Sequence, residues 1–271
     1  MSYILFNGTF HPPEGKLFSP QTLNELLFRD KLKMIKSKLL FWDEHLNLWQ
    51  LHFQLFRIAL PDFIANNGKE LRRQIERCLV KNKCYKSAQI QLTFFNTGKT
   101  ISYLIELEPE ADSAYPFDAD GYSVQLFHQI YKSDSPLSSL STGSETLWEI
   151  ARTAIPGRKE IPIIMDRNQN LLEVPGANLF LVRENQLLTP NRDEGTYINP
   201  AKRVVGQIAQ KIQMDFDETN TIREDDLRQA DEVFVADDIR GIRFIRAFGM
   251  KRYYKKTTSS IAEEFNRLLV Q

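Results

Sequence analysis

Cysteines, long apolar runs and metal-ligand patterns are all scarce in this sequence of 271 residues. Cys78 and Cys84 are the only cysteines, so no disulfide framework is indicated and both are expected to be reduced. The four histidines lack the spacing of a zinc site. The N-terminal residues lack the basic flank and apolar centre of a signal peptide, and no later run is long enough to cross a bilayer. We therefore expect a cytoplasmic protein with no metal site and no membrane partner.

The chain also has a formal net charge of zero at pH 7. The 35 basic and 35 acidic side chains cancel, so no long-range field would attract nucleic acid, and we expect no nucleic-acid partner. The glycine-rich loops of nucleotide-binding proteins and the G-x-S-x-G motif of serine hydrolases are also absent from the sequence. These absences favour a small-molecule or protein partner.

The remaining patterns predict a chain of two domains. The first half contains an N-terminal hairpin, a helix that begins near Asp43 and ends before Pro61, a second helix over 69–81, and a hairpin over 88–107. The acidic, proline-containing stretch 112–121 is the predicted linker. In the second half, strands are predicted at 122–130, 161–166, 178–182, 186–190, 232–237 and 242–248, with helices at 143–154 and 201–213. We expect an α+β fold of mostly antiparallel sheets with segregated helices, with domains at 1–111 and 122–271.

One motif is more specific. In EVPGANLFLVRENQLLTP, Glu173 ends one strand and Asn178 opens an apolar strand five residues later. The segment resembles the E-x-x-x-x-N-[LI]-F…TP signature of the fold-type IV pyridoxal-phosphate enzymes, the class IV aminotransferases. These include branched-chain aminotransferases, D-amino acid aminotransferases and aminodeoxychorismate lyases. The resemblance runs in diluted form from Ile4 to Ile245. It implies a two-domain, D-amino acid aminotransferase-like architecture, a ligand cleft between the domains and a homodimer.

The resemblance also implies a pyridoxal 5'-phosphate cofactor and an amino acid-like small molecule as substrate. Glu173 would pair with the pyridine nitrogen of the cofactor and keep it protonated; the alternative is a surface glutamate at a strand end. Asn178 belongs to the same cofactor-binding motif. Backbone amides of Ala201 and Lys202, at a helix N-terminus, would hold the phosphate. Pro200 stands where the family has a glycine, and proline offers no N–H there.

The position of the family's imine-forming lysine is the main departure from the pattern. Aligning SPLSSLSTGSETLWEIA without gaps on P-L-S-x-x-K-[TS]-x-N-Y-L places Ser141 at the lysine position, and a hydroxyl cannot form an imine. Lys132 is the only lysine in the preceding loop, and using it would require a shift of nine residues with an insertion. Ser141 and Lys132 are therefore the two candidates for the position of the imine-forming lysine.

Two phosphate contacts of the family also have substitutes here. Asn47, in HLNLW, stands where the family has a phosphate-binding arginine, and one bidentate contact is thereby lost. In EVFVADD, Asp238, next to Asp237, stands where the family has a small hydroxyl residue, and a carboxylate repels phosphate. Two hypotheses follow. The chain is a pyridoxal-phosphate-dependent aminotransferase or aminodeoxychorismate lyase that uses Lys132, or it is a non-catalytic relative that binds another small ligand or serves as an interaction module.

Overall fold

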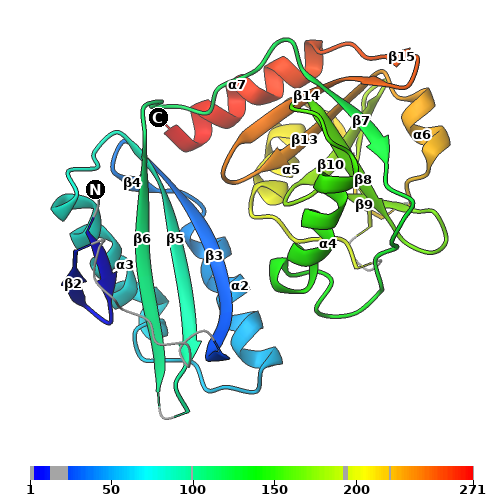
Figure 1. Ribbon diagram of the computed structural model, residues 1–271. Coiled ribbons are helices and arrows are strands. Elements are labelled where there is room, and N and C mark those ends of the chain that lie inside the picture. The colour runs from blue at the N-terminus through cyan, green and yellow to red at the C-terminus, as the bar shows by residue number, and fades with distance from the viewer. Residues whose placement is uncertain (1–2, 13–23, 99, 192–194, 220, 271) are drawn as a thin grey trace. The chain divides into compact units, whose positions relative to one another are not determined.

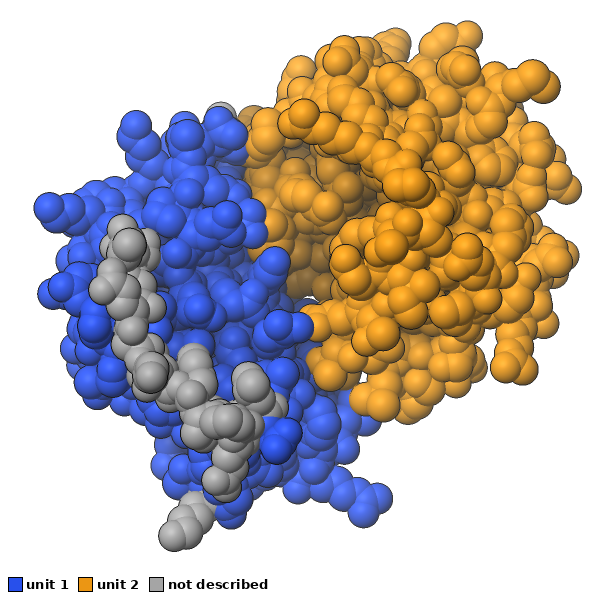
Figure 2. All heavy atoms as spheres, viewed as in Figure 1, with its two compact units in different colours: residues 1–114, 270 blue, residues 115–269, 271 orange. Residues whose placement is uncertain are grey.

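The computed structural model describes residues 3–12, 24–98, 100–191, 195–219 and 221–270, and these form two compact units. Unit 1 comprises residues 1–114 and unit 2 residues 115–269 (Figure 2). Of the predicted linker 112–121, residues from Tyr115 onward lie in unit 2. The Tyr115 side chain is buried there, and its ring packs edge-on against Phe265. No helix within the described residues is long and apolar enough to cross a membrane.

Unit 1 is built on a six-stranded antiparallel sheet in the order β2-β1-β6-β5-β3-β4 (Figure 1). The two long central hairpin strands alternate apolar and polar residues, which lets one face be buried while the other stays polar. The strands are β1 (Ile4–Phe6), β2 (Thr9–His11), β3 (Leu26–Ile35), β4 (Lys38–Leu39), β5 (Ser87–Asn96) and β6 (Ile101–Glu110).

Two helices pack on this sheet, α2 (Trp42–Leu55) and α3 (Ala65–Lys81). Asp43 was expected to be the N-cap residue of α2, but that residue is Phe41, in a left-handed conformation, and Asp43 lies in the first turn of the helix. In α3, Asn66, Asn67 and Gly68 have positive φ angles, so the regular helix starts at Lys69, as predicted. Buried side chains of both helices, including Trp49 and Ile75, join those of the sheet in one apolar core.

Unit 2 contains a nine-stranded sheet in the order β12-β11-β10-β13-β14-β7-β8-β9, with β15 paired to β14. The sheet is mixed: β7 pairs in parallel with β14 and β8, and β11 with β12. The strands are β7 (Tyr122–Leu126), β8 (Glu160–Met165), β9 (Leu171–Glu173), β10 (Asn178–Arg183), β11 (Gln186–Leu188), β12 (Asp215–Asp217), β13 (Glu232–Asp237), β14 (Gly241–Phe248) and β15 (Lys251–Arg252).

The helices of unit 2 are α4 (Ser141–Ala154), α5 (Ala201–Lys211), α6 (Glu224–Gln229) and α7 (Lys256–Val270). The last expected element ended at Phe248, so α7 is a helix that the sequence patterns did not reveal. Its N-terminus is held by the buried Glu232 carboxylate, which accepts hydrogen bonds from the backbone N–H groups of Thr257 (2.8 Å) and Thr258 (2.7 Å). A carboxylate at a helix N-terminus satisfies orphan amides and complements the helix dipole. Helices that pack beside largely antiparallel sheets agree with the predicted α+β class.

Candidate functional site

A buried carboxylate with a complete set of donors lies at the end of β9. Glu173 is fully buried. Its Oε2 accepts hydrogen bonds from the Lys132 ammonium (2.5 Å) and from the backbone N–H of Tyr197 (2.5 Å), and its Oε1 accepts one from Trp148 Nε1 (2.7 Å). Lys132 is 4% exposed and Trp148 5%. The three donors therefore surround the carboxylate in a water-poor environment.

The local chain path explains how Lys132 reaches this carboxylate. The predicted strand 122–130 ends early, at Leu126, because the chain leaves the sheet there. It returns to the end of β8, where the N–H of Lys132 donates to the carbonyl of Met165 (2.8 Å) and Lys132 forms a parallel bridge with Asp166. On its other side β8 pairs with β9, where Ile164 is the partner of Glu173, so the bridge places Lys132 across β8 from Glu173.

The other two donors come from α4 and from the loop before α5. Trp148 lies on α4, and its ring meets that of Tyr197 edge to face, with centroids 4.8 Å apart. Tyr197 lies just before α5. Together the two rings and the aliphatic stem of Lys132 cover Glu173, which explains the absence of exposed surface on its side chain.

Burial dominates the electrostatics of the pair. It raises the pKa of Glu173 above its usual value, against the opposing effects of Lys132, Trp148 and the Tyr197 amide. Burial likewise lowers the pKa of Lys132, against the attraction of Glu173. Desolvation penalises both charged forms, and each partner offsets part of that penalty for the other.

A second buried polar cluster centres on Asn199. Its Nδ2 donates to Asp238 Oδ1 (2.7 Å), and its Oδ1 accepts from the backbone N–H groups of Ala201 (2.9 Å) and Asp238 (3.1 Å). The Asn199 N–H points at Asn178 Oδ1 (3.3 Å), while Asn178 Nδ2 donates to the carbonyl of Tyr197 (2.6 Å). Every residue of this cluster is buried or nearly so, and the Tyr197 backbone links it to Glu173.

This cluster uses the amides that the family resemblance assigns to a phosphate. The N–H of Ala201 is bonded to the Asn199 side chain, and the N–H of Lys202 donates to the Asn199 carbonyl (3.1 Å). The Lys202 ammonium contacts the Pro190 carbonyl (3.2 Å) and Glu218 (3.2 Å). Pro200, with φ of −50°, is the N-cap residue of α5, so the helix starts normally after the proline.

Asp237 is bonded to two arginines and not to the Asn199 cluster. Its carboxylate accepts from the guanidinium groups of Arg240 (3.1 Å) and Arg243 (2.9 Å) and from the backbone N–H of Arg240 (2.7 Å). Burial acts to raise the pKa of Asp237, but the two arginines outweigh it, and the pKa is lowered. Asp237 therefore acts as an ionised anchor for the β13–β14 turn.

The hydrogen bonds of these clusters do not involve the remaining predicted residues, Ser141 and Asn47. Ser141 is the first residue of α4 and is half-buried. Asn47 belongs to unit 1, on the exposed side of α2. Trp148, Tyr197 and Asn199 were not predicted. Asn199 carried a usable signal, because asparagine is favoured immediately before a helix; the role of Trp148 depends on a contact across 25 residues and had no local signal.

Comparisons with known proteins agree on one family. The model of the family described as amino-transferase class IV matches residues 30–248. Among solved structures, the branched-chain aminotransferase of Thermoproteus uzoniensis, in a crystal with norvaline, is 17% identical, with a TM-score of 0.84 over 99% of this chain and 95% of the other. The Escherichia coli branched-chain aminotransferase is 17% identical, with a TM-score of 0.81 over 99% and 94%.

A hypothetical aminotransferase from Mycobacterium tuberculosis, in a PLP-bound form, is 15% identical, with a TM-score of 0.82 over 99% of each chain. Comparison with curated proteins gave no match. At these identities the structural likeness establishes a shared fold.

Proposed function

The chain belongs to the class IV aminotransferase family, and we propose that it is a non-catalytic member, in which the cofactor site has become a self-contained polar core. The observation that carries the proposal is the 2.5 Å contact between the Lys132 ammonium and Glu173 Oε2. It puts a protein cation where the resemblance assigns the protonated ring nitrogen of pyridoxal phosphate. The carboxylate then has no need of a cofactor to offset its burial.

The geometry of the cofactor does not fit this arrangement. The ring nitrogen and the aldehyde group of pyridoxal lie at opposite ends of the ring. A lysine that forms the imine must therefore stand a full ring away from the glutamate that holds the nitrogen. Lys132 instead touches Glu173 directly, and Trp148 and the Tyr197 amide take the remaining acceptor positions.

The phosphate end fits no better. The Ala201 amide is engaged by Asn199, and the Asp238 carboxylate accepts from the same side chain. A phosphate at this position would have to displace Asn199 and approach a carboxylate, which is electrostatically unfavourable. Ser141, at the family's lysine position, supplies a hydroxyl that cannot form an imine. Together with Asn47 in place of the family's arginine, the substitutions at Ser141 and Asp238 disfavour the same ligand.

Under this proposal the protein binds a different small ligand or a protein partner and does not transfer amino groups. The homodimer and the amino acid-like ligand implied by the family resemblance remain predictions. A family fold does not dictate chemistry, because function resides in the site built on it.

Incubation with pyridoxal phosphate, followed by borohydride reduction and peptide mass spectrometry, tests the proposal. We expect purified protein to be colourless, with no near-visible absorption from an imine, and no reduced cofactor on Lys132. Exposed lysines can react nonspecifically, so Lys159→Met serves as the control for surface labelling. Stoichiometric labelling of Lys132 that is lost in Lys132→Met would overturn the proposal.

A second candidate function is that of an active enzyme in which Lys132 forms the imine. Burial lowers the pKa of Lys132, and a buried lysine with a lowered pKa offers the neutral amine that imine formation requires. In that case Lys132 would have to move away from Glu173 to admit the cofactor. The protein would then be an aminotransferase or an aminodeoxychorismate lyase. Covalent labelling of Lys132, as above, decides between the two candidates.

A further inference from the structure

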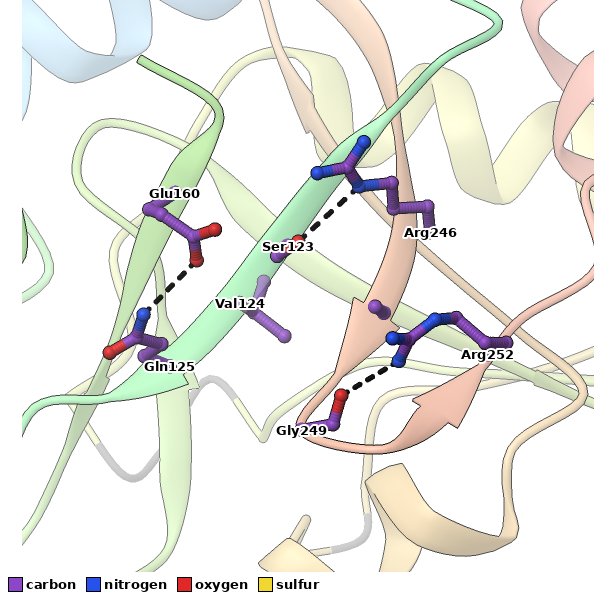
Figure 3. Close-up of a pocket in the computed structure, with 8 residues that line it drawn as sticks. Ser123, Val124, Gln125, Glu160, Arg246, Gly249 and Arg252 are labelled. Atoms are coloured by element: carbon purple, nitrogen blue, oxygen red, sulfur yellow. Dashed lines mark hydrogen bonds between the residues drawn. The ribbon is translucent and has the colours of Figure 1, made fainter. Parts of the chain in front are cut away.

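A hollow of about 550 Å³ lies on unit 2, where β7 runs between β14 and the start of β8 (Figure 3). It shares no residue with the Glu173 and Asn199 clusters. Its polar lining comes from Ser123, Gln125, Glu160, Arg246 and Arg252. A volume of this size is typical of a site for a small molecule.

A β-bulge directs Arg246 toward this hollow. Tyr122 and Ser123 are consecutive on β7, but they pair with Ile245 and Ala247 of β14, so Arg246 is the extra residue between them. Bulges bend a strand and re-aim one side chain, and they are frequent beside functional sites. Here the Arg246 guanidinium extends over β7, and its Nε points at Ser123 Oγ (3.4 Å).

Arg252 faces the hollow from the β15 side. Its NH1 donates to the carbonyls of Gly249 (2.7 Å) and Lys251 (3.1 Å), which holds the guanidinium in place by one edge. Among the described residues, no carboxylate lies within salt-bridge distance of Arg246 or Arg252. By contrast, Arg183 and Arg243 of the same unit are both ion-paired. Two guanidinium groups that have no carboxylate partner in the described part of the chain therefore line the hollow, and that of Arg252 is held by backbone carbonyls.

The opposite side of the hollow carries a negative charge. Glu160, at the start of β8, accepts from Gln125 Nε2 (3.2 Å), and Figure 3 shows both on the side of β7 away from Arg252. A ligand with anionic groups at both ends would meet Glu160 at one of them. A ligand with one anionic head and a hydroxyl or amino group at its other end matches both sides.

From these observations we infer that the hollow is a binding site for a small organic acid with a single anionic head, either a carboxylate or a phosphate monoester. Arg246 and Arg252 bind the head, since guanidinium groups match both anions in geometry and charge. Glu160 and Gln125 bind a donor group at the far end. The inference is independent of whether unit 2 retains pyridoxal-phosphate chemistry.

Titration of the full chain, monitored by calorimetry and by NMR, tests this site. The probes are glycerol 3-phosphate, 4-aminobutyrate and succinate; the first two separate phosphate from carboxylate recognition, and succinate carries a second carboxylate. We expect saturable binding of at least one of the first two. Arg246→Gln and Arg252→Gln should each weaken it roughly tenfold or more, as expected for loss of a charge-assisted contact.

Two further variants sharpen the test. Arg72→Gln removes the same charge from an exposed position of unit 1 and should leave the affinity unchanged. Glu160→Gln should tighten succinate binding, because it removes the repelling carboxylate from the far side. The inference is overturned if neither glycerol 3-phosphate nor 4-aminobutyrate binds saturably, if Arg72→Gln weakens binding as much as the other arginine variants, or if Glu160→Gln leaves succinate binding unaltered.

Discussion

Replacing Lys132 with methionine isolates the Glu173 carboxylate in the interior of unit 2. Removing one partner of a buried ion pair typically costs about 3–5 kcal/mol, because the other charge is left uncompensated. Glu173 keeps two donors, Trp148 Nε1 and the Tyr197 amide. We therefore expect the lower end of that range, about 3 kcal/mol at pH 8, which is roughly a hundredfold change in the unfolding equilibrium.

The loss should depend on pH in a defined direction. Burial raises the pKa of Glu173, so in the folded protein this carboxyl binds a proton more tightly than in the unfolded chain. Between the unfolded value, 4.5, and the raised folded value, the folded form binds more protons, and stability increases as the pH falls. Without Lys132 the folded pKa rises further. The deficit of Lys132→Met relative to wild type should therefore be largest at pH 8 and smaller near pH 5.5.

Urea unfolding at both pH values gives the global measurement, and hydrogen exchange of the Tyr197 amide gives the local one, since that N–H donates to Glu173 Oε2. The double variant Lys132→Met/Glu173→Gln should recover part of the loss at pH 8, because no charge remains buried. Lys159→Met, at a half-exposed lysine paired with Asp118 and Asp120, should change stability by no more than about 1 kcal/mol. An equal deficit at both pH values, or no deficit at all, would refute this account of the pair.

Three further substitutions test other parts of the structure, the first two by urea unfolding and the third by hydrogen exchange. Asn199→Ala removes a buried side chain that bonds two amides and a carboxylate and should destabilise the protein by roughly 2–4 kcal/mol; a value below about 1 would show that the cluster is not held together by this residue. Gly121→Ala places a methyl group 2.5 Å from a Phe244 ring carbon and should lower stability clearly more than Gly98→Ala, which has a similar positive φ but open space; equal losses would contradict the steric argument. Glu232→Ala should loosen α7 and accelerate exchange of its first amides, while unchanged exchange would mean that the carboxylate is dispensable.

The family and most of the helices and strands could be predicted from the sequence. The Glu173–Asn178 spacing and the strand that follows are local patterns, and the match of the family model to residues 30–248 confirms the resemblance they indicated. Helical periodicity located α2 and the regular part of α3, because both present one apolar face to the sheet of unit 1. The C-terminal helix was missed although Ile261 and Phe265 recur at helical spacing and are buried; the contact that fixes its first amides, from Glu232, comes from 25 and 26 residues away and has no local signal.

The candidate site could likewise be predicted only in part from the sequence. From the sequence, the alignment without gaps favoured Ser141 for the lysine position, and Lys132 was the alternative that required a shift of nine residues with an insertion. Only the tertiary structure brought Lys132 against Glu173, 41 residues away, and Asn199 against Asp238, 39 residues away. Propensity and motif spacing describe neighbours along the chain, whereas these contacts depend on strand register and on where a loop rejoins β8. The sequence by itself therefore determined the fold and the identity of the buried glutamate, and the packing of unit 2 decided which groups surround it.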